Sequence, residues 1–146
     1  DREGQKRIVE ALVLGAPEPV SAQKLAEVVP GLEAEEARSI VAAPTDEQAR
    51  EEVWPHYEAL MTRIGAERGW PPASRAQFDR EAGPDGALCV GSPETVAAKI
   101  VKTVRLLGLA RFDVKYSSGT LPHGALMRSI ELFGTKVAPR VRELLG

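Results

Sequence analysis

The stretch VGSPETVA, residues 90–97, decides how the larger part of this chain folds. Ser92 is a good N-cap, Pro93 takes the first helical position, and Glu94 places an acid in the first turn. Apolar residues then recur every three or four positions, which is the spacing of one helix face. The pattern predicts an amphipathic helix over residues 92–107.

A strand and a second helix follow on the C-terminal side. Residues 111–116, RFDVKY, alternate apolar and charged side chains, which predicts a half-buried strand. Residues 117–119, Ser-Ser-Gly, end it, and an apolar stripe predicts a last helix over 122–145 with bends at Gly134 and Pro139. A helix, a strand and a helix in this order are typical of the closing units of an alternating α/β barrel.

On the N-terminal side of residue 90 the pattern is mainly helical as far as residue 46. Residues 46–69 have helical spacing, and Pro55 inside them predicts a kink or a break near Trp54. A short helix is expected over 74–81, within a stretch from 71 to 91 that is otherwise predicted as loop.

Residues 1–41 are predicted to form three short helices, over about 3–15, from Ser21 to a Pro-Gly turn, and over 33–41. This arrangement matches a helix-turn-helix pattern. The third helix carries three glutamates in its first turn, which would repel phosphates, so we favour a small helical packing unit over DNA binding.

The composition of the chain argues against several classes of function. The chain has 146 residues, 43% of them hydrophobic, and a formal net charge of −2. This balance gives no general attraction to nucleic acid or membrane surfaces, and no apolar run approaches the ~20 residues of a membrane span. The N-terminus lacks a signal-peptide layout, and Cys89 has no partner for a disulfide. A cytoplasmic location and a buried thiol are therefore expected.

The chain is expected to divide at the segment VAAPT, residues 41–45, because the residue before a proline is biased away from helix. All aromatic residues lie after residue 50. We predict a three-helix, truncated winged-helix-like segment over 1–43 and an α/β segment over 44–146. The predicted fold class is mainly α with one or two short strands.

Several strings within residues 45–145 match one known family. They include DEQAR (46–50), WPHY (54–57), GPDG (83–86), VGSPETVA (90–97) and RSIELFG (128–134). With these strings, residues 45–145 resemble the C-terminal part of a luciferase-like monooxygenase. The resemblance implies a (β/α)₈ barrel and a flavin, either FMN or a deazaflavin. Such a barrel needs about 250 residues, so only an incomplete one fits here and no robust activity is expected.

The first segment resembles a different family. The strings GQKRIVEAL (4–12), EPVS (18–21) and KLA (24–26) make residues 1–41 similar to the start of segregation and condensation protein B. That resemblance implies a winged helix that binds a kleisin-like subunit of the bacterial chromosome condensation complex.

Three functions therefore remain open from the sequence. The first is a part of a flavin-dependent oxidoreductase that has no activity by itself. The second is a protein-interaction module like segregation and condensation protein B. The third is a natural or engineered chimera that serves as a scaffold without inherited function. Whether it is an enzyme stays undecided. No nucleic acid or membrane is expected as a partner. Because an isolated strand at 111–116 has two open edges, a homo-oligomer is expected.

Candidate site residues follow the predicted strand. The backbone N–H groups of Ser117, Ser118 and Gly119 could meet a phosphate or a flavin edge, although an ordinary turn is the favoured alternative. His123 could act as a general acid or base if it lined a pocket; a surface histidine is the favoured alternative. His56 is predicted on a helix surface. No metal site is predicted, because two distant histidines and one cysteine do not make one.

Overall fold

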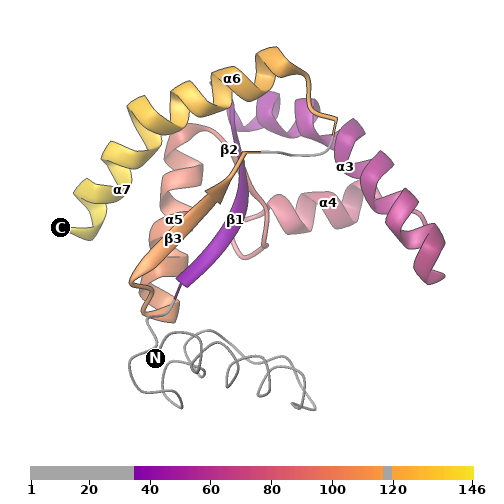
Figure 1. Ribbon diagram of the computed structural model, residues 1–146, viewed down its shortest axis with the longest axis horizontal. Coiled ribbons are helices and arrows are strands. Elements are labelled where there is room, and N and C mark those ends of the chain that lie inside the picture. Colours follow the sequence, from indigo (N-terminus) through magenta and orange to yellow (C-terminus); the bar gives the residue numbers. More distant parts are fainter. Residues whose placement is uncertain (1–34, 117–119) are drawn as a thin grey trace, which may run out of the picture. The chain divides into compact units, whose positions relative to one another are not determined.

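The computed structural model describes residues 35–116 and 120–146. In chain order their elements are β1 (Glu35–Ala42), α3 (Asp46–Arg68), α4 (Arg75–Ala82), β2 (Cys89–Gly91), α5 (Pro93–Leu107), β3 (Arg111–Lys115), α6 (His123–Leu132), the π-helical turn η1 (Phe133–Val137) and α7 (Ala138–Leu145) (Figure 1). This part of the chain is mainly helical with a small sheet, which confirms the predicted fold class. No helix within it is long and apolar enough to span a membrane.

Contacts divide the chain into two compact units. One contains residues 1–37 and 102–113, and the other contains residues 38–101 and 114–146. The described residues of the first unit are few: the start of β1, the end of α5, the turn after it and the start of β3. The candidate sites described below belong to the second unit.

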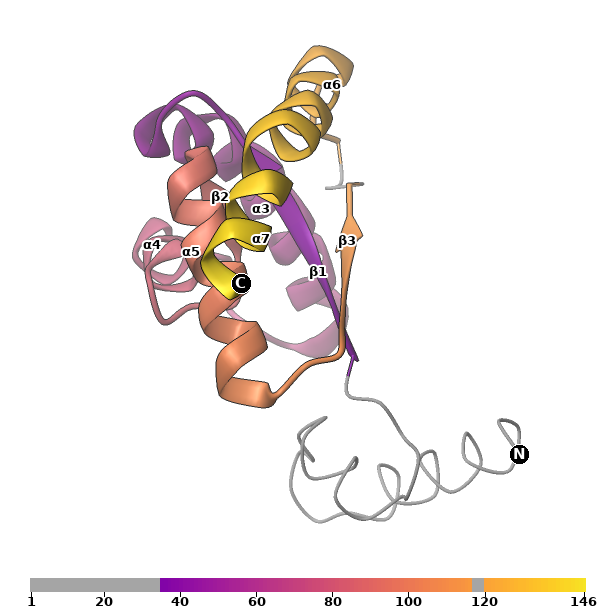
Figure 2. The same ribbon diagram turned by 90° about the vertical axis from the view of Figure 1, so that its left-hand side faces the viewer.

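The sheet has three strands in the order β2-β1-β3. β1 and β2 are parallel and pair Ile40 with Cys89, Val41 with Val90 and Ala42 with Gly91. These six residues are all buried, as is typical of parallel strands covered on both faces. Figure 2 shows α4, α5 and α7 on one side of β1. The predicted buried thiol of Cys89 is confirmed.

Two strands differ from the sequence predictions. The helix predicted over 33–41 is wrong for residues 35–42, which form β1, and β2 lies inside the predicted loop 71–91. The periodicity of a short apolar run such as residues 40–43 does not distinguish a helix from a strand. Here the run forms a strand because it pairs with the parallel strand β2. The helices predicted before residue 34 lie outside the described residues.

Helix α3 has the caps that its sequence predicts. The Thr45 hydroxyl accepts a hydrogen bond from the Gln48 N–H at 3.1 Å, and Gly69 ends the helix with a φ of 70°. Of the two alternatives predicted near Trp54, a kink or a break, the break is wrong, because the helix runs from residue 46 to residue 68 with Pro55 inside it. The kink stays a prediction. The buried face of α3, which includes Ala49 and Val53, packs into the core and holds the helix together across the proline.

The core lies between α3, α4 and the β1–β2 pair. Phe78 of α4 is fully buried, and its ring centroid lies 5.5 Å from that of Trp54 and 5.1 Å from that of Tyr57. The other members of this cluster are Val41, Ala43, Ala49, Val53, Ala82 and Val90. Because α4 supplies the largest buried side chain, this short helix anchors the connection between the two parallel strands.

The last helix bends where its sequence predicts. α6 and α7 form one run that is interrupted by η1 over Phe133–Val137 (Figure 1). The Ala138 N–H bonds to the Phe133 carbonyl, five residues back, so the regular ladder shifts just before Pro139, which has no N–H to donate. Gly134 lies inside this π-helical turn.

Candidate functional site

Polar groups gather where β1 and β2 end. Asp46 begins α3 after β1, and Ser92 precedes α5 after β2. One carboxylate oxygen of Asp46 accepts the Ser92 N–H at 2.6 Å, and the other accepts the Thr95 hydroxyl at 3.0 Å. The carboxyl edge of parallel strands is where α/β folds place their ligands, so this edge is the first candidate site.

The Asp46 carboxylate is held in its ionised form. Partial burial raises its pKa, but hydrogen bonds from the Ser92 backbone and the Thr95 side chain outweigh burial, so the pKa lies below its ordinary value of 3.8. Gly91 makes room for this contact: a Cβ there would lie 2.7 Å from the Asp46 carboxylate and 2.9 Å from the Thr95 methyl group. The start of α5 therefore already binds an anion that belongs to the chain itself.

Substituting Asp46 with asparagine should lower the free energy of unfolding at pH 7 by about 1 kcal/mol, as expected for weakening an anion at a helix start. Because the folded-state pKa is below 3.8, the carboxylate's contribution is complete above that value and is lost as the pH falls through the folded-state pKa. Urea unfolding at pH 7 and pH 3 should show the wild type losing its advantage over D46N at the lower pH. Glu47→Gln is the control at the neighbouring position. If D46N lost the same free energy of unfolding relative to the wild type at both pH values, the prediction would be contradicted.

Helix α6 is fixed to the same edge by a buried hydroxyl. The Ala42 N–H donates to Ser129 Oγ at 2.9 Å, and both residues are almost fully buried. Without this acceptor the Ala42 N–H would be buried and unpaired. Ser129 was not among the site residues predicted from the sequence. The feature that could have indicated it is a small hydroxyl side chain within the apolar stripe of the last helix.

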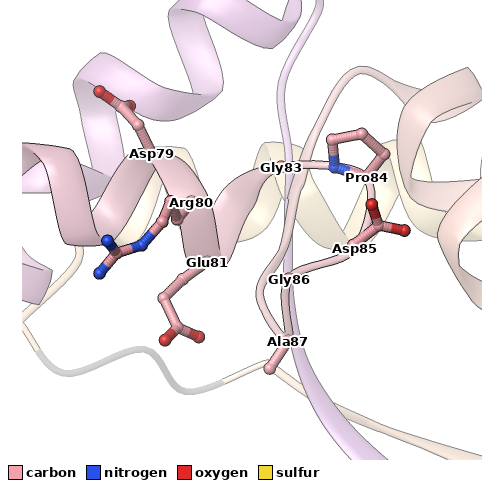
Figure 3. A pocket seen from close by; sticks show the side chains of 8 residues that line it. All are labelled: Asp79, Arg80, Glu81, Gly83, Pro84, Asp85, Gly86 and Ala87. Atoms are coloured by element: carbon pink, nitrogen blue, oxygen red, sulfur yellow. The ribbon is translucent and has the colours of Figure 1, made fainter.

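A second polar region is the turn after α4. A cavity of about 610 Å³ is lined by Asp79, Arg80, Glu81 and residues 83–87 (Figure 3). Figure 3 shows the carboxylates of Asp79, Glu81 and Asp85 pointing in different directions. No group of three or more potential metal ligands occurs in the part of the chain that the structure describes, so these acids do not form a metal centre.

The turn itself is tightly constrained. A Cβ on Gly86 would lie 2.0 Å from the Glu81 carbonyl oxygen, so only glycine fits there. The ammonium group of Lys99, on α5, contacts the carbonyl oxygens of Gly83 at 2.6 Å, Leu88 at 2.5 Å and Ala82 at 3.3 Å. Lys99 is 6% exposed, so its three donors replace water at the end of α4. This lysine therefore has a structural role, because it holds the turn that lines the cavity.

A third region lies on α3. His56 Nδ1 is 2.7 Å from Thr120 Oγ1, and both line a cavity of about 390 Å³ together with Ala59, Leu60 and Arg63. His56 is half-buried there. The pair could not be read from the sequence, because its members are 64 residues apart.

The site residues predicted from the sequence are placed only in part. Ser117, Ser118 and Gly119 lie outside the described residues. His123 is the first residue of α6 and is exposed. Its role as a general acid or base stays a prediction.

Two parallel strands joined by helices, with polar groups at their carboxyl edge, define an α/β unit of the kind that β/α barrels repeat. Consecutive strands are neighbours in such a barrel, whereas β1 here lies between β2 and β3. This order differs from the barrel order because β1 has eight residues and β2 only three, so β1 offers β3 the longer edge for pairing.

Two solved structures have a similar fold over most of this chain. The chain is similar to the monooxygenase RslO1 from Streptomyces bottropensis, with 21% identity and a TM-score of 0.62 over 81% of this chain. It is also similar to a type II Baeyer-Villiger monooxygenase, the oxygenating constituent of 3,6-diketocamphane monooxygenase from Pseudomonas putida, solved in complex with FMN, with 18% identity and a TM-score of 0.52 over 92% of this chain. The chain spans 37% and 38% of their lengths. No family model and no curated protein matches it.

Proposed function

We propose that this chain is part of a luciferase-like flavin-dependent monooxygenase and supplies scaffold to its barrel rather than the flavin site. The observation that carries the proposal is the structural similarity to two monooxygenases over 81% and 92% of the chain, although the chain spans under two-fifths of either. The strings that resemble the family, VGSPETVA and RSIELFG, supply Ser92, Thr95 and Ser129, the residues that hold α5 and α6 at the carboxyl edge.

A bound flavin would supply the redox chemistry: reduced FMN would donate electrons to dioxygen, which then oxidises the substrate, whereas an oxidised deazaflavin would accept a hydride from the substrate. The described residues do not fit its phosphate at the carboxyl edge of β1 and β2, because the Asp46 carboxylate already accepts the N–H of Ser92 there. A phosphate at that place would meet like charge at close range. We therefore expect the chain to be catalytically silent by itself.

The other functions have less support. The resemblance of residues 1–41 to segregation and condensation protein B falls almost entirely outside the described residues, and no comparison supports that family or a chimera. The premise of an isolated strand at 111–116 is wrong, because β3 is paired with β1. Self-association remains part of the proposal on another ground: among the described strands, β2 and β3 each have one outer edge without a described partner.

The proposal is tested by titrating the purified chain with oxidised and reduced FMN, followed by flavin fluorescence, while the mass is measured by sedimentation. We expect no saturable binding at micromolar FMN and a mass above that of the 15.7 kDa monomer. Saturable micromolar binding would overturn the scaffold role, because the chain would then complete a flavin site. A monomer would overturn the self-association.

A further inference from the structure

The cavity on α3 is not used by the proposed function. It measures about 390 Å³, within the ordinary range for small-molecule sites, and its lining combines two apolar residues with His56, Arg63 and Thr120. We propose that this cavity binds the phosphate group of a small molecule. The inference does not depend on the monooxygenase proposal.

The His56–Thr120 pair leaves a hydrogen-bond donor available in every protonation state. If Thr120 donates its hydroxyl hydrogen to Nδ1 of His56, the neutral imidazole carries its own hydrogen on Nε2. If Nδ1 carries the hydrogen and donates to Oγ1, the hydroxyl hydrogen is left for a ligand. In the imidazolium, Nδ1–H donates to Oγ1, so the Nε2 hydrogen and the hydroxyl hydrogen are both left for a ligand. The pair therefore always keeps at least one hydrogen that its internal hydrogen bond does not use, and two when the ring is charged.

Arg63 adds a permanent positive charge to the same cavity. It follows His56 by seven residues, two turns along α3, so the two side chains share one face of the helix. Arg63 is exposed and forms no ion pair with any residue in the ranges 35–116 and 120–146. Its guanidinium matches phosphate oxygens in a bidentate geometry, which an ammonium group does not.

The rest of the lining favours an anion over other ligands. Ala59 and Leu60 are apolar, and none of the five described residues that line the cavity carries a carboxylate. A cation would meet Arg63, and an apolar molecule would leave the three polar groups without acceptors. A phosphate group has several acceptor oxygens and up to two negative charges, so it pairs with all three polar side chains at once.

The test uses the two histidines of the chain as reporters. Inorganic phosphate is titrated at constant ionic strength, and the imidazole C–H signals of His56 and His123 are followed by NMR. We expect a saturable shift of the His56 signal at millimolar phosphate and no saturable shift of His123, which is exposed at the start of α6. Binding in this range is too weak to register in a micromolar FMN titration, so the two proposals fail or succeed separately.

Two variants locate the site. Arg63→Gln should weaken phosphate binding by about tenfold, the effect of losing one charge-assisted hydrogen bond. Arg68→Gln is the matched control on the same helix, since Arg68 lies over the Trp70 ring at 5.1 Å and not in the cavity lining, and it should leave the affinity unchanged. Equal shifts of both histidines, an unchanged affinity in Arg63→Gln, or acetate binding as tightly as phosphate would overturn the proposal.

Discussion

Replacing Phe78 with alanine should lower the free energy of unfolding by about 3–5 kcal/mol, the range for truncating a buried phenylalanine. Phe78 is 0% exposed and is the largest fully buried side chain among the described residues. Its ring packs against Trp54 and Tyr57 of α3, so the truncation opens a cavity between α3 and α4. Because a domain of this size is stable by only about 5–15 kcal/mol, the variant should be marginally folded at 37 °C.

The loss is measured by urea unfolding followed by circular dichroism. Leu106→Ala is the control, because it removes an apolar side chain that is 69% exposed and should change the stability by less than about 0.5 kcal/mol. A Phe78→Ala deficit below about 1 kcal/mol would mean that the aromatic cluster is not the centre of the core.

The second large effect is expected at Lys99. Replacing it with methionine keeps an unbranched side chain but removes the ammonium group that contacts the carbonyl oxygens of Ala82, Gly83 and Leu88. These carbonyls would then lack that donor where water has little access. We expect a loss of about 2–4 kcal/mol, since removing one partner leaves buried polar groups unsatisfied.

The same urea measurement applies, with Lys102→Met as the control. Lys102 lies on the same helix but is exposed, so its replacement should be nearly neutral. A second readout separates a local from a global effect. The amide hydrogen of Leu88, bonded to the Glu81 carbonyl, should exchange faster in Lys99→Met if the turn loosens. A Lys99→Met variant as stable as the wild type would show that the lysine does not hold the turn.

The helices were predictable because their signals are local. Thr45 and Ser74 cap α3 and α4 with their hydroxyls, and the Ser92 hydroxyl accepts the N–H of Thr95 at the start of α5. Each bond joins residues three positions apart, so the short sequence window that contains the cap also contains the whole interaction.

The two parallel strands were not predictable in the same way. β1 pairs with β2, whose Val90 stands opposite Val41, and the buried apolar run around Val41 is as compatible with a helix as with a strand. The pairing partner lies beyond two helices, and no local pattern names it. The helix predicted over 33–41 failed for this reason.

The candidate sites also combine residues that local sequence patterns indicate with contacts that only the tertiary structure shows. Asp46 and Ser92 are recognisable as helix-start residues, but their contact joins residues 46 positions apart. His56 and Thr120 have no sequence signal as a pair. The expected contribution of Ser117, Ser118 and Gly119 stays a prediction.

By itself the sequence determined the helices, their caps, the strand β3 and the bend before Pro139, because each depends on side chains within one or two turns of each other. The resemblance to a luciferase-like monooxygenase also came from local strings. Only the tertiary structure decided that β1 and β2 are strands, that Asp46 fills the start of α5, and that His56, Arg63 and Thr120 share one cavity. The physical reason is that pairing and burial depend on partners distant in the chain, whose identity no short pattern contains.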